Sequence, residues 1–222
     1  MKKINIISDS LQGTTHRENQ DGVLIIDEGD YLLCFIFDGV SRSVNPSKAV
    51  ETVKNYIQSE YRLFINAETH DLRNLMYSAE KILWESEWRG ALTTYAALGF
   101  LREDTCNIFF SNLGDSRIYL LYEDRLQKIT RDHTLYPGSN ILTKCLGTGR
   151  LSEDDFLQEK LNTDSIGILL ATDGFYSILE NEQDTFFHVL REENCSNLKR
   201  MIRDLLQGKN YDDASYIFLK TV

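Results

Sequence analysis

The chain has 222 residues, of which 42% are hydrophobic and 26% are charged, so we expect one globular domain over residues 1–222 with a sizeable core. Its formal net charge of −10 argues against binding to nucleic acid and against adsorption to anionic membranes. No apolar run approaches transmembrane length, and residues 1–9 lack the long apolar stretch of a signal peptide. These features predict a cytoplasmic protein, which we expect to be a monomer.

Segments rich in β-branched and aromatic residues predict eight strands. They lie near residues 3–8, 22–27, 31–37, 93–101, 105–111, 116–122, 166–172 and 214–220. A hairpin turn at Asp124-Arg125 joins the strand that ends near 123 to a further short segment, 126–129. Residues 130–165 are the least regular part of the chain and are expected to pack over the mouth of a site.

Apolar residues at helical spacing predict four helices. The first begins at Asn45-Pro46, where Asn45 is the expected N-cap, and the second covers roughly 70–86. Two more are expected over 182–192 and 196–207, the latter ending at Gly208. Because strands and helices do not alternate one by one, the order favours a largely antiparallel α+β architecture.

The four cysteines, Cys34, Cys106, Cys145 and Cys195, are widely separated, and no two of them form a CxxC pair. Cys34 and Cys106 lie among strand-like residues and are interpreted as core thiols of a reduced compartment.

Carboxylates recur at the ends of predicted strands. Two apolar runs end in Asp-Gly, at Asp38 and Asp173, and Asp21, Asp115 and Asp212 lie in comparable places. A strand that ends in Asp-Gly delivers a carboxylate to the rim of a sheet. Since aspartate oxygens suit hard divalent cations such as Mg²⁺ or Mn²⁺, the pattern predicts a metal-dependent hydrolase.

Short motifs around these acids follow one another in a definite order. They are Asn19-Gln20-Asp21, Phe37-Asp38-Gly39, Leu92-Thr93-Thr94, Leu113-Gly114-Asp115-Ser116-Arg117, Thr130-Arg131-Asp132-His133-Thr134, Leu146-Gly147, Ala171-Thr172-Asp173-Gly174 and Asp212-Asp213-Ala214-Ser215. In this order and context, from about residue 5 to the end, the chain resembles the metal-dependent protein phosphatases, the PPM or protein phosphatase 2C-like group. The sequence Gly13-Thr14-Thr15-His16, followed by Gln20-Asp21, is similar to a bacterial subgroup of this family.

The resemblance implies a four-layer αββα sandwich, in which two antiparallel sheets lie between pairs of helices. It implies a serine/threonine phosphatase that hydrolyses phosphoserine and phosphothreonine in proteins with two bridged Mn²⁺ or Mg²⁺ ions. A phosphorylated protein would be its substrate, and a serine/threonine kinase is a reasonable partner in signalling.

The resemblance also implies roles for individual residues. By position, Asp38 is similar to the carboxylate that bridges both ions, and the Gly39 carbonyl is similar to an additional ligand. Asp173 and Asp212 would bind one ion, while Asp21 would contact the other mainly through water.

Asp115 resembles the residue that, with Asp173, can hold a third and weaker ion. Bound cations would reverse the repulsion between carboxylates and a phosphomonoester, and they would lower the pKa of a shared water to form the nucleophile. Asp38 and Asp173 are therefore the expected catalytic carboxylates, and no nucleophilic cysteine is required.

Two departures from the family pattern concern proton transfer and the metal site. Val40-Ser41-Arg42-Ser43 follows Gly39 where many members carry glycines or a histidine, so the histidine that acts as a general acid in some relatives has no counterpart. Metal-bound water or His133 could supply that proton. Gln20 replaces the acid often found before Asp21.

A third departure concerns phosphate binding. The family often has an arginine five positions before the aspartate, where this chain has His16, and Arg17 follows it. His16, Arg17 and Arg42 are all candidates, and Arg17 is favoured because a guanidinium binds phosphate with two parallel hydrogen bonds. Asp213 takes the place of a family asparagine and is interpreted as structural.

These departures leave a second function open: a phosphatase-like regulatory or binding module with weak or no turnover. The retained acids favour the enzyme. A phosphotransferase of the haloacid dehalogenase type is disfavoured, because its chemistry requires an Asp-x-Asp motif and the residue two positions after Asp38 is Val40.

Overall fold

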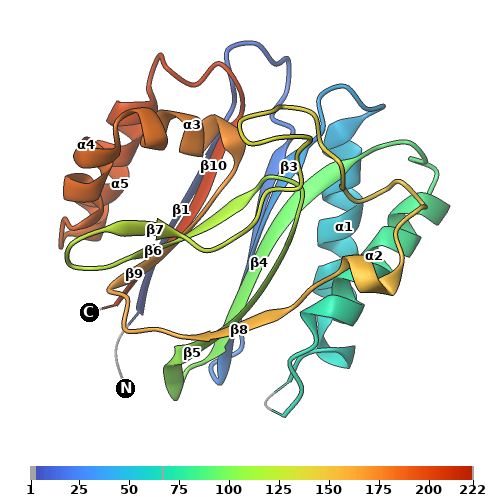
Figure 1. Cartoon of the computed structure of the whole chain (residues 1–222), viewed down its shortest axis with the longest axis horizontal. Coiled ribbons are helices and arrows are strands. Elements are labelled where there is room, and N and C mark those ends of the chain that lie inside the picture. Colours follow the sequence, from blue (N-terminus) through green and yellow to red (C-terminus); the bar gives the residue numbers. More distant parts are fainter. Residues whose placement is uncertain (1–3, 67, 222) are drawn as a thin grey trace.

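The computed structural model describes residues 4–66 and 68–221, and in these residues two five-stranded antiparallel sheets and five α-helices form four layers (Figure 1). In order across the first sheet, the strands are β1 (Ile4–Leu11), β10 (Ala214–Thr221), β9 (Gly167–Ala171), β6 (Arg117–Leu121) and β7 (Leu126–Lys128). Across the second they are β2 (Asp21–Asp27), β3 (Tyr31–Gly39), β4 (Thr93–Leu101), β5 (Asp104–Leu113) and β8 (Glu159–Asn162).

Helices cover the outer face of each sheet (Figure 1). The second sheet is covered by α1 (Pro46–Glu60) and α2 (Leu72–Glu85), and the first by α3 (Asp173–Asn181), α4 (Gln183–Leu190) and α5 (Cys195–Leu206). Short 3₁₀ turns lie at Tyr61–Leu63 and Glu153–Asp155. The predicted α+β sandwich is confirmed. None of the helices in the described part of the chain is both long and apolar enough to cross a bilayer.

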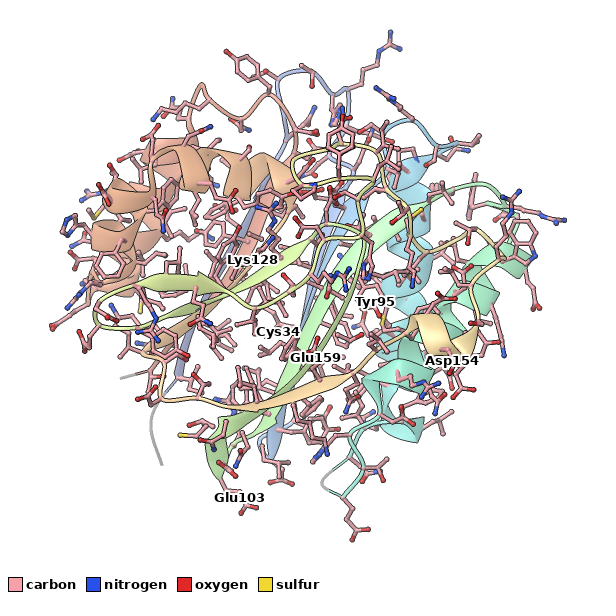
Figure 2. All side chains as sticks on the ribbon, viewed as in Figure 1. Cys34, Tyr95, Glu103, Lys128, Asp154 and Glu159 are labelled. Carbon is pink, nitrogen blue, oxygen red and sulfur yellow. The ribbon has the colours of Figure 1, made fainter. Side chains whose placement is uncertain are left out.

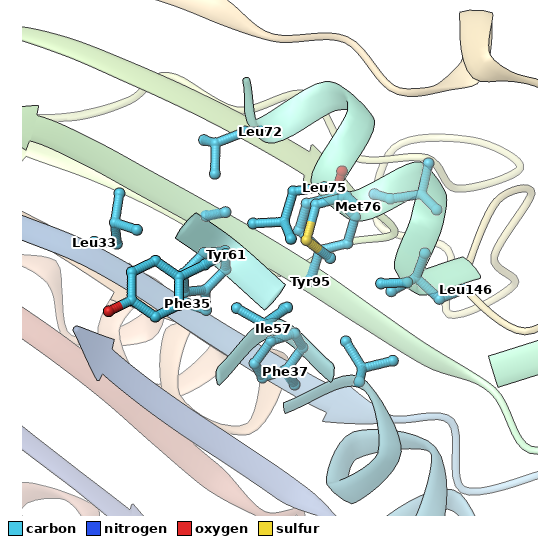
Figure 3. Close-up of a cluster of buried hydrophobic side chains, with 14 of the residues drawn as sticks. Leu33, Phe35, Phe37, Ile57, Tyr61, Leu72, Leu75, Met76, Tyr95 and Leu146 are labelled. Atoms are coloured by element: carbon cyan, nitrogen blue, oxygen red, sulfur yellow. The ribbon is translucent and has the colours of Figure 1, made fainter. Parts of the chain in front are cut away.

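The strand β3 shows how the sequence builds these layers. Successive side chains of a strand point to opposite faces, and both faces of β3 are buried. Leu33, Phe35 and Phe37 pack against α1 and α2, as Figure 3 shows, whereas Cys34 and Ile36 pack between the two sheets. The same alternation places Asp38, two residues after Ile36, on the face that looks toward the other sheet.

The structure differs from the sequence prediction at several elements. Helix α3 begins at Asp173, directly after β9, and the sequence analysis did not predict it because the Asp-Gly pair was interpreted only as a strand end. The edge strand β8 was not predicted either, since Glu159–Asn162 is short and polar. Asn45 is the N-cap of α1, but it adopts the left-handed conformation (φ 50°) and its side chain makes no capping hydrogen bond.

The cysteines are free thiols. Cys34 lies in the interior between the sheets, while Glu103 lies at the periphery on the turn between β4 and β5 (Figure 2). Cys145 is also buried. Cys106 is partly exposed, so its interpretation as a core thiol is wrong: it lies near the start of β5, beyond the buried centre of the sheet.

Candidate active site

Asp21 and Asp38 come from neighbouring strands of the second sheet. They are register partners at the end of the β2–β3 ladder, and Asp38 is also the partner of Thr94 on β4. The hydroxyl of Thr172 donates a hydrogen bond to Asp21 Oδ2 at 2.8 Å, which links this pair to the end of β9 in the first sheet.

Asp115, Asp173 and Asp212 come from the first sheet. Ala171 on β9 is the register partner of Tyr216 on β10 and of Arg117 on β6. Asp173 lies two residues after Ala171, while Asp115 and Asp212 lie shortly before their strands, so antiparallel pairing brings all three to one edge.

A cavity of about 180 Å³ lies where the edges of the two sheets meet, and Asp38, Asp115, Asp173 and Asp212 all line it. The other lining residues are Val40, Ser41, Arg42, Thr94, Asn140 and Leu142. Asp21 does not line this cavity, although it pairs with Asp38 directly beside it.

Burial and crowding raise the pKa values of four carboxyl groups at the site, those of Asp21, Asp38, Asp115 and Asp173. The pKa of Asp38 is well above its usual value because of burial and of the nearby charges of Asp173 and Asp21. Burial, with Asp115 and Asp212 nearby, raises the pKa of Asp173 to about 7, and burial is also the main cause that raises the pKa of Asp115 to about 6. Burial likewise raises the pKa of Asp21, although hydrogen bonds from Ser215 and Thr172 oppose this.

This arrangement fits divalent cations. The aspartates offer only oxygen ligand atoms, which hard cations prefer, and a cation among them would offset the mutual repulsion that, together with burial, raises the pKa values of Asp38, Asp115 and Asp173. The Gly39 residue predicted as an additional ligand directly follows Asp38 and is buried, and its N–H donates to the Gln20 carbonyl at 3.1 Å.

A loop before β2 is fastened to the site by Asp213, whose side chain is 1% exposed. Asp213 Oδ1 accepts a hydrogen bond from the Gly13 N–H at 2.6 Å, and Oδ2 accepts from the Gln20 N–H at 2.7 Å. His16 Nδ1 lies 2.9 Å from the same Oδ2 and 3.4 Å from Asp212 Oδ1.

His16, Asp212 and Asp213 therefore offer three potential ligand atoms within 4.8 Å of one another. Both oxygens of Asp213 already accept hydrogen bonds from the loop, and His16 Nδ1 faces an acceptor, so this nitrogen is the donor. We interpret this group as a hydrogen-bonded anchor beside the cavity.

The candidates for phosphate binding separate in the structure. Arg42 lines the cavity, whereas Arg17 is exposed and is not among the lining residues. His16 Nε2 lies 3.3 Å from the hydroxyl of Ser41, which also lines the cavity.

His133 is turned toward the turn that carries Asp115. The ring nitrogen Nδ1 of His133 accepts a hydrogen bond from the backbone N–H of Gly114 at 3.2 Å, and the backbone N–H of His133 donates to the Gly114 carbonyl at 2.8 Å. Burial lowers the pKa of His133. These contacts indicate that His133 holds the turn.

A larger groove of about 470 Å³ adjoins the cavity and shares Asn140, Asp173 and Asp212 with it. One wall is formed by residues 134–140, and the other by α3 with residues 209–211. Arg117 also lines this groove and forms ion pairs with Asp132 at 2.7 Å and with Glu180 at 2.6 Å.

Several residues at the site were given no role there by the sequence. Thr94 lines the cavity, and its hydroxyl lies 2.7 Å from that of Ser116. Asn140 and Leu142 belong to the irregular segment 130–165, where no motif marks them. The Thr93 hydroxyl donates a hydrogen bond to the Asp38 carbonyl at 2.8 Å.

No protein-family model matches the chain. A Mycoplasma genitalium protein named "Putative protein phosphatase" is 31% identical over 137 residues, which cover 53% of this chain and 50% of that protein. The chain thus spans about half the length of the curated relative that it matches.

Several solved structures have the same fold as this chain over nearly its whole length. A bacterial serine phosphatase has a TM-score of 0.82 at 20% identity, with 100% of this chain and 98% of that chain covered. The serine/threonine phosphatase Stp1 from Staphylococcus aureus has a TM-score of 0.79 at 19% identity, with 99% and 95% covered. The PPM Ser-Thr phosphatase MsPP from Mycobacterium smegmatis has a TM-score of 0.77 at 16% identity, with 97% of each chain covered. The chain therefore has the fold of the bacterial PPM-type serine/threonine phosphatases, as its ordered motifs predict.

Proposed function

We propose that the whole chain acts as a single metal-dependent phosphatase domain, which removes phosphate from phosphoserine and phosphothreonine in cytoplasmic proteins. The observation that carries this proposal is the cavity between the sheet edges, where Asp38, Asp115, Asp173 and Asp212 converge beside Asp21. The structures that share this fold include serine/threonine phosphatases, which supports the same reaction.

Two Mn²⁺ or Mg²⁺ ions would be held by Asp38, Asp173, Asp212 and the Gly39 carbonyl, with Asp21 acting mainly through water. Asp115 and Asp173 would hold a third, weaker ion. Once bound, the ions would neutralise charge on the phosphate and activate a water molecule for attack on phosphorus. The raised pKa values of Asp38, Asp115 and Asp173 support this assignment, because they mark carboxylates that are buried and lie near other carboxylates.

The chain's own residues would bind and orient the phosphate. Arg42 lines the cavity, and its planar guanidinium suits a phosphate group. We therefore assign it the phosphate contact for which the sequence favoured Arg17. Thr93 holds the Asp38 backbone and Thr172 holds the Asp21 carboxylate, so both fix the acids that the ions require.

The adjoining groove supports a protein substrate. It continues directly from the cavity and is more than twice as large, at about 470 Å³ against about 180 Å³. Its walls offer neutral polar side chains, among them Thr134, Ser139, Ser177 and Asn181, which can bind a peptide backbone. A phosphoester in the cavity would leave this groove for the polypeptide on either side of the phosphorylated residue.

Hydrolysis of p-nitrophenyl phosphate by purified protein with Mn²⁺, with Mg²⁺ and with EDTA tests the proposal. We expect metal-dependent turnover that is lost in Asp38→Asn by more than about a hundredfold, because a bridging carboxylate supports several kcal/mol of charge stabilisation. Asp30→Asn, an exposed acid on the β2–β3 turn, is the matched control. Correct folding and Mn²⁺ binding without turnover under any condition would instead support the regulatory module.

A further inference from the structure

A carboxylate outside the site is buried on α2. Glu80 is only 2% exposed, and it faces residues 147–149. Its carboxylate accepts hydrogen bonds from the Gly147 N–H, from the Gly149 N–H at 2.7 Å and from the Thr148 hydroxyl at 3.3 Å. Among the described residues, no lysine or arginine forms an ion pair with it, so hydrogen-bond donors of this one loop hold its charge.

The loop is pressed closely against its surroundings. Gly147 has φ +94°, and a Cβ there would lie 2.2 Å from the Ala91 carbonyl oxygen. Gly149 has φ +65°, and a Cβ there would lie 2.3 Å from the indole ring of Trp84 on α2. Only glycine suits these two positions. The backbone N–H groups can therefore approach the Glu80 carboxylate closely.

From this loop, hydrogen bonds lead to the backbone of a predicted metal ligand. Leu146 and Thr93 form a two-way bridge, with the Leu146 N–H donating at 2.8 Å and the Thr93 N–H donating at 3.2 Å. The Thr93 hydroxyl then donates to the Asp38 carbonyl at 2.8 Å, and Thr93 is the register partner of Gly39. Leu146 is fully buried in the layer between α2 and the sheet (Figure 3).

The same segment also forms part of the cavity wall. Asn140 and Leu142 line the cavity, a few residues before the loop that Glu80 holds. The Thr143 N–H donates to the His133 carbonyl at 2.8 Å, and His133 in turn holds the turn before Asp115. A shift of residues 144–149 would therefore reach both Asp38 and the wall of the cavity.

Building on the proposed function, we propose that Glu80 is a positioning residue, which fixes residues 144–149 against α2 and, through Leu146 and Thr93, places the Asp38–Gly39 backbone for metal binding. An acid at a fully buried helix position is costly unless its oxygens are satisfied, and here the loop donors satisfy them. An apolar side chain would fill the same space without ordering the loop.

Glu80→Gln tests this role with little change in volume. Glutamine has one acceptor oxygen, and its amide group would face N–H donors of the loop. In the metal-free protein we expect faster hydrogen exchange over residues 144–149. By titration calorimetry we expect Mn²⁺ affinity to fall by about tenfold or more, as is usual when a residue that supports a metal ligand is lost. In turnover, we expect kcat to fall more than KM rises.

Two further variants separate positioning from stability. Glu85→Gln changes an exposed acid on the same helix and is the matched control. Thr93→Val removes the hydroxyl bond to Asp38 further along the same route, and it should also lower Mn²⁺ affinity. If Glu80 acts through Thr93, the variant that carries both Glu80→Gln and Thr93→Val will lose less Mn²⁺ binding free energy than the sum of the losses in the two single variants.

The outcomes are distinct. Normal Mn²⁺ affinity in Glu80→Gln, with only a lower melting temperature, would overturn the proposal and leave Glu80 as a structural residue. Unchanged hydrogen exchange over 144–149 would also overturn it. Absence of turnover in the wild-type protein would count against the proposed function instead, while exchange and calorimetry would still test the role of Glu80. Should Glu80→Gln fail to fold, Thr93→Val with unaltered Mn²⁺ affinity would overturn the route.

Discussion

The imidazole Nδ1 of His16 lies 2.9 Å from Oδ2 of Asp213, a carboxylate whose side chain is 1% exposed. Asp213 also accepts hydrogen bonds from the backbone N–H groups of Gly13 and Gln20. One buried acid therefore holds both ends of the loop 13–20, which precedes β2. In this position the loop brings His16 Nε2 to 3.3 Å from Ser41, at the edge of the cavity.

This relationship predicts different effects for two substitutions of His16. His16→Ala removes one hydrogen-bond partner of buried Asp213, which should cost about 1–3 kcal/mol of folding free energy. For a chain of this size that is a fall of roughly 2–12 °C in melting temperature. His16→Asn should retain most of the stability, because the asparagine Nδ2 can occupy the position of Nδ1. Thermal unfolding of the metal-free proteins measures both, and equal losses in the two variants would contradict the anchoring role of Nδ1.

Arg42 and Arg17 should differ in their effect on phosphate binding. Arg42 lines the cavity and Arg17 does not. Arg42→Ala should therefore raise KM for p-nitrophenyl phosphate by about tenfold or more, because a charge-assisted hydrogen bond contributes roughly 1.5–3 kcal/mol. Arg17→Ala should have a clearly smaller effect. Steady-state kinetics with saturating Mn²⁺ measure KM for both variants. A larger increase in KM for Arg17→Ala than for Arg42→Ala would show that Arg17 makes the phosphate contact.

Much of the fold could be predicted because its strands carry strong local patterns. The β3 strand combines a continuous apolar run with a terminal Asp-Gly, and the structure buries both of its faces and brings Asp38 to the edge between the sheets. Helices α1 and α2 follow from apolar residues at helical spacing. In contrast, α3 is short and starts within the Asp-Gly motif, so the motif concealed it.

Residues that act through tertiary contacts could not be predicted in the same way. Glu80 lies on an amphipathic helix, and nothing in the local sequence marks it as buried or joined to residues 147–149. Asn140 reaches the cavity from an irregular segment whose path depends on isolated bridges such as that of Thr134 with Leu142. Spacing in the sequence does not determine such contacts, because they join residues far apart in the chain.

The crowded carboxylates predict an unusual dependence of stability on pH. A carboxyl group whose pKa is raised on folding, such as Asp173 at about 7, binds its proton more tightly in the folded than in the unfolded protein. Its contribution to stability is therefore greatest at low pH and is lost as the pH rises through the folded pKa. Metal-free protein should thus gain stability from Asp173→Asn at pH 8 and gain clearly less at pH 5, which lies between the ordinary and the folded pKa.

Thermal unfolding with EDTA at the two pH values measures this difference, and comparison of the variant with wild type cancels the titration of groups that lie away from the carboxylate cluster. Saturating Mn²⁺ should reverse the order at pH 8, because the ion stabilises the wild-type carboxylate cluster and binds the variant more weakly. A wild-type protein that is more stable than Asp173→Asn at pH 8 in EDTA would contradict the conclusion that burial and neighbouring carboxylates destabilise the ionised Asp173.

The groove beside the cavity predicts that one substitution on α3 separates peptide from small substrates. Ser177 is exposed and lines the groove, whereas it does not line the cavity that holds the four aspartates. Ser177→Arg should fill part of the groove and lower kcat/KM for a phosphoserine peptide by about tenfold, a loss of roughly 1.4 kcal/mol in transition-state binding. Hydrolysis of p-nitrophenyl phosphate should change much less, because its aromatic ring need not enter the groove.

Gln58→Arg, an exposed position on α1, adds the same charge on the other helical layer and is the control. Equal losses for both substrates would mean that the groove does not carry the peptide and that Ser177→Arg disturbs the cavity itself.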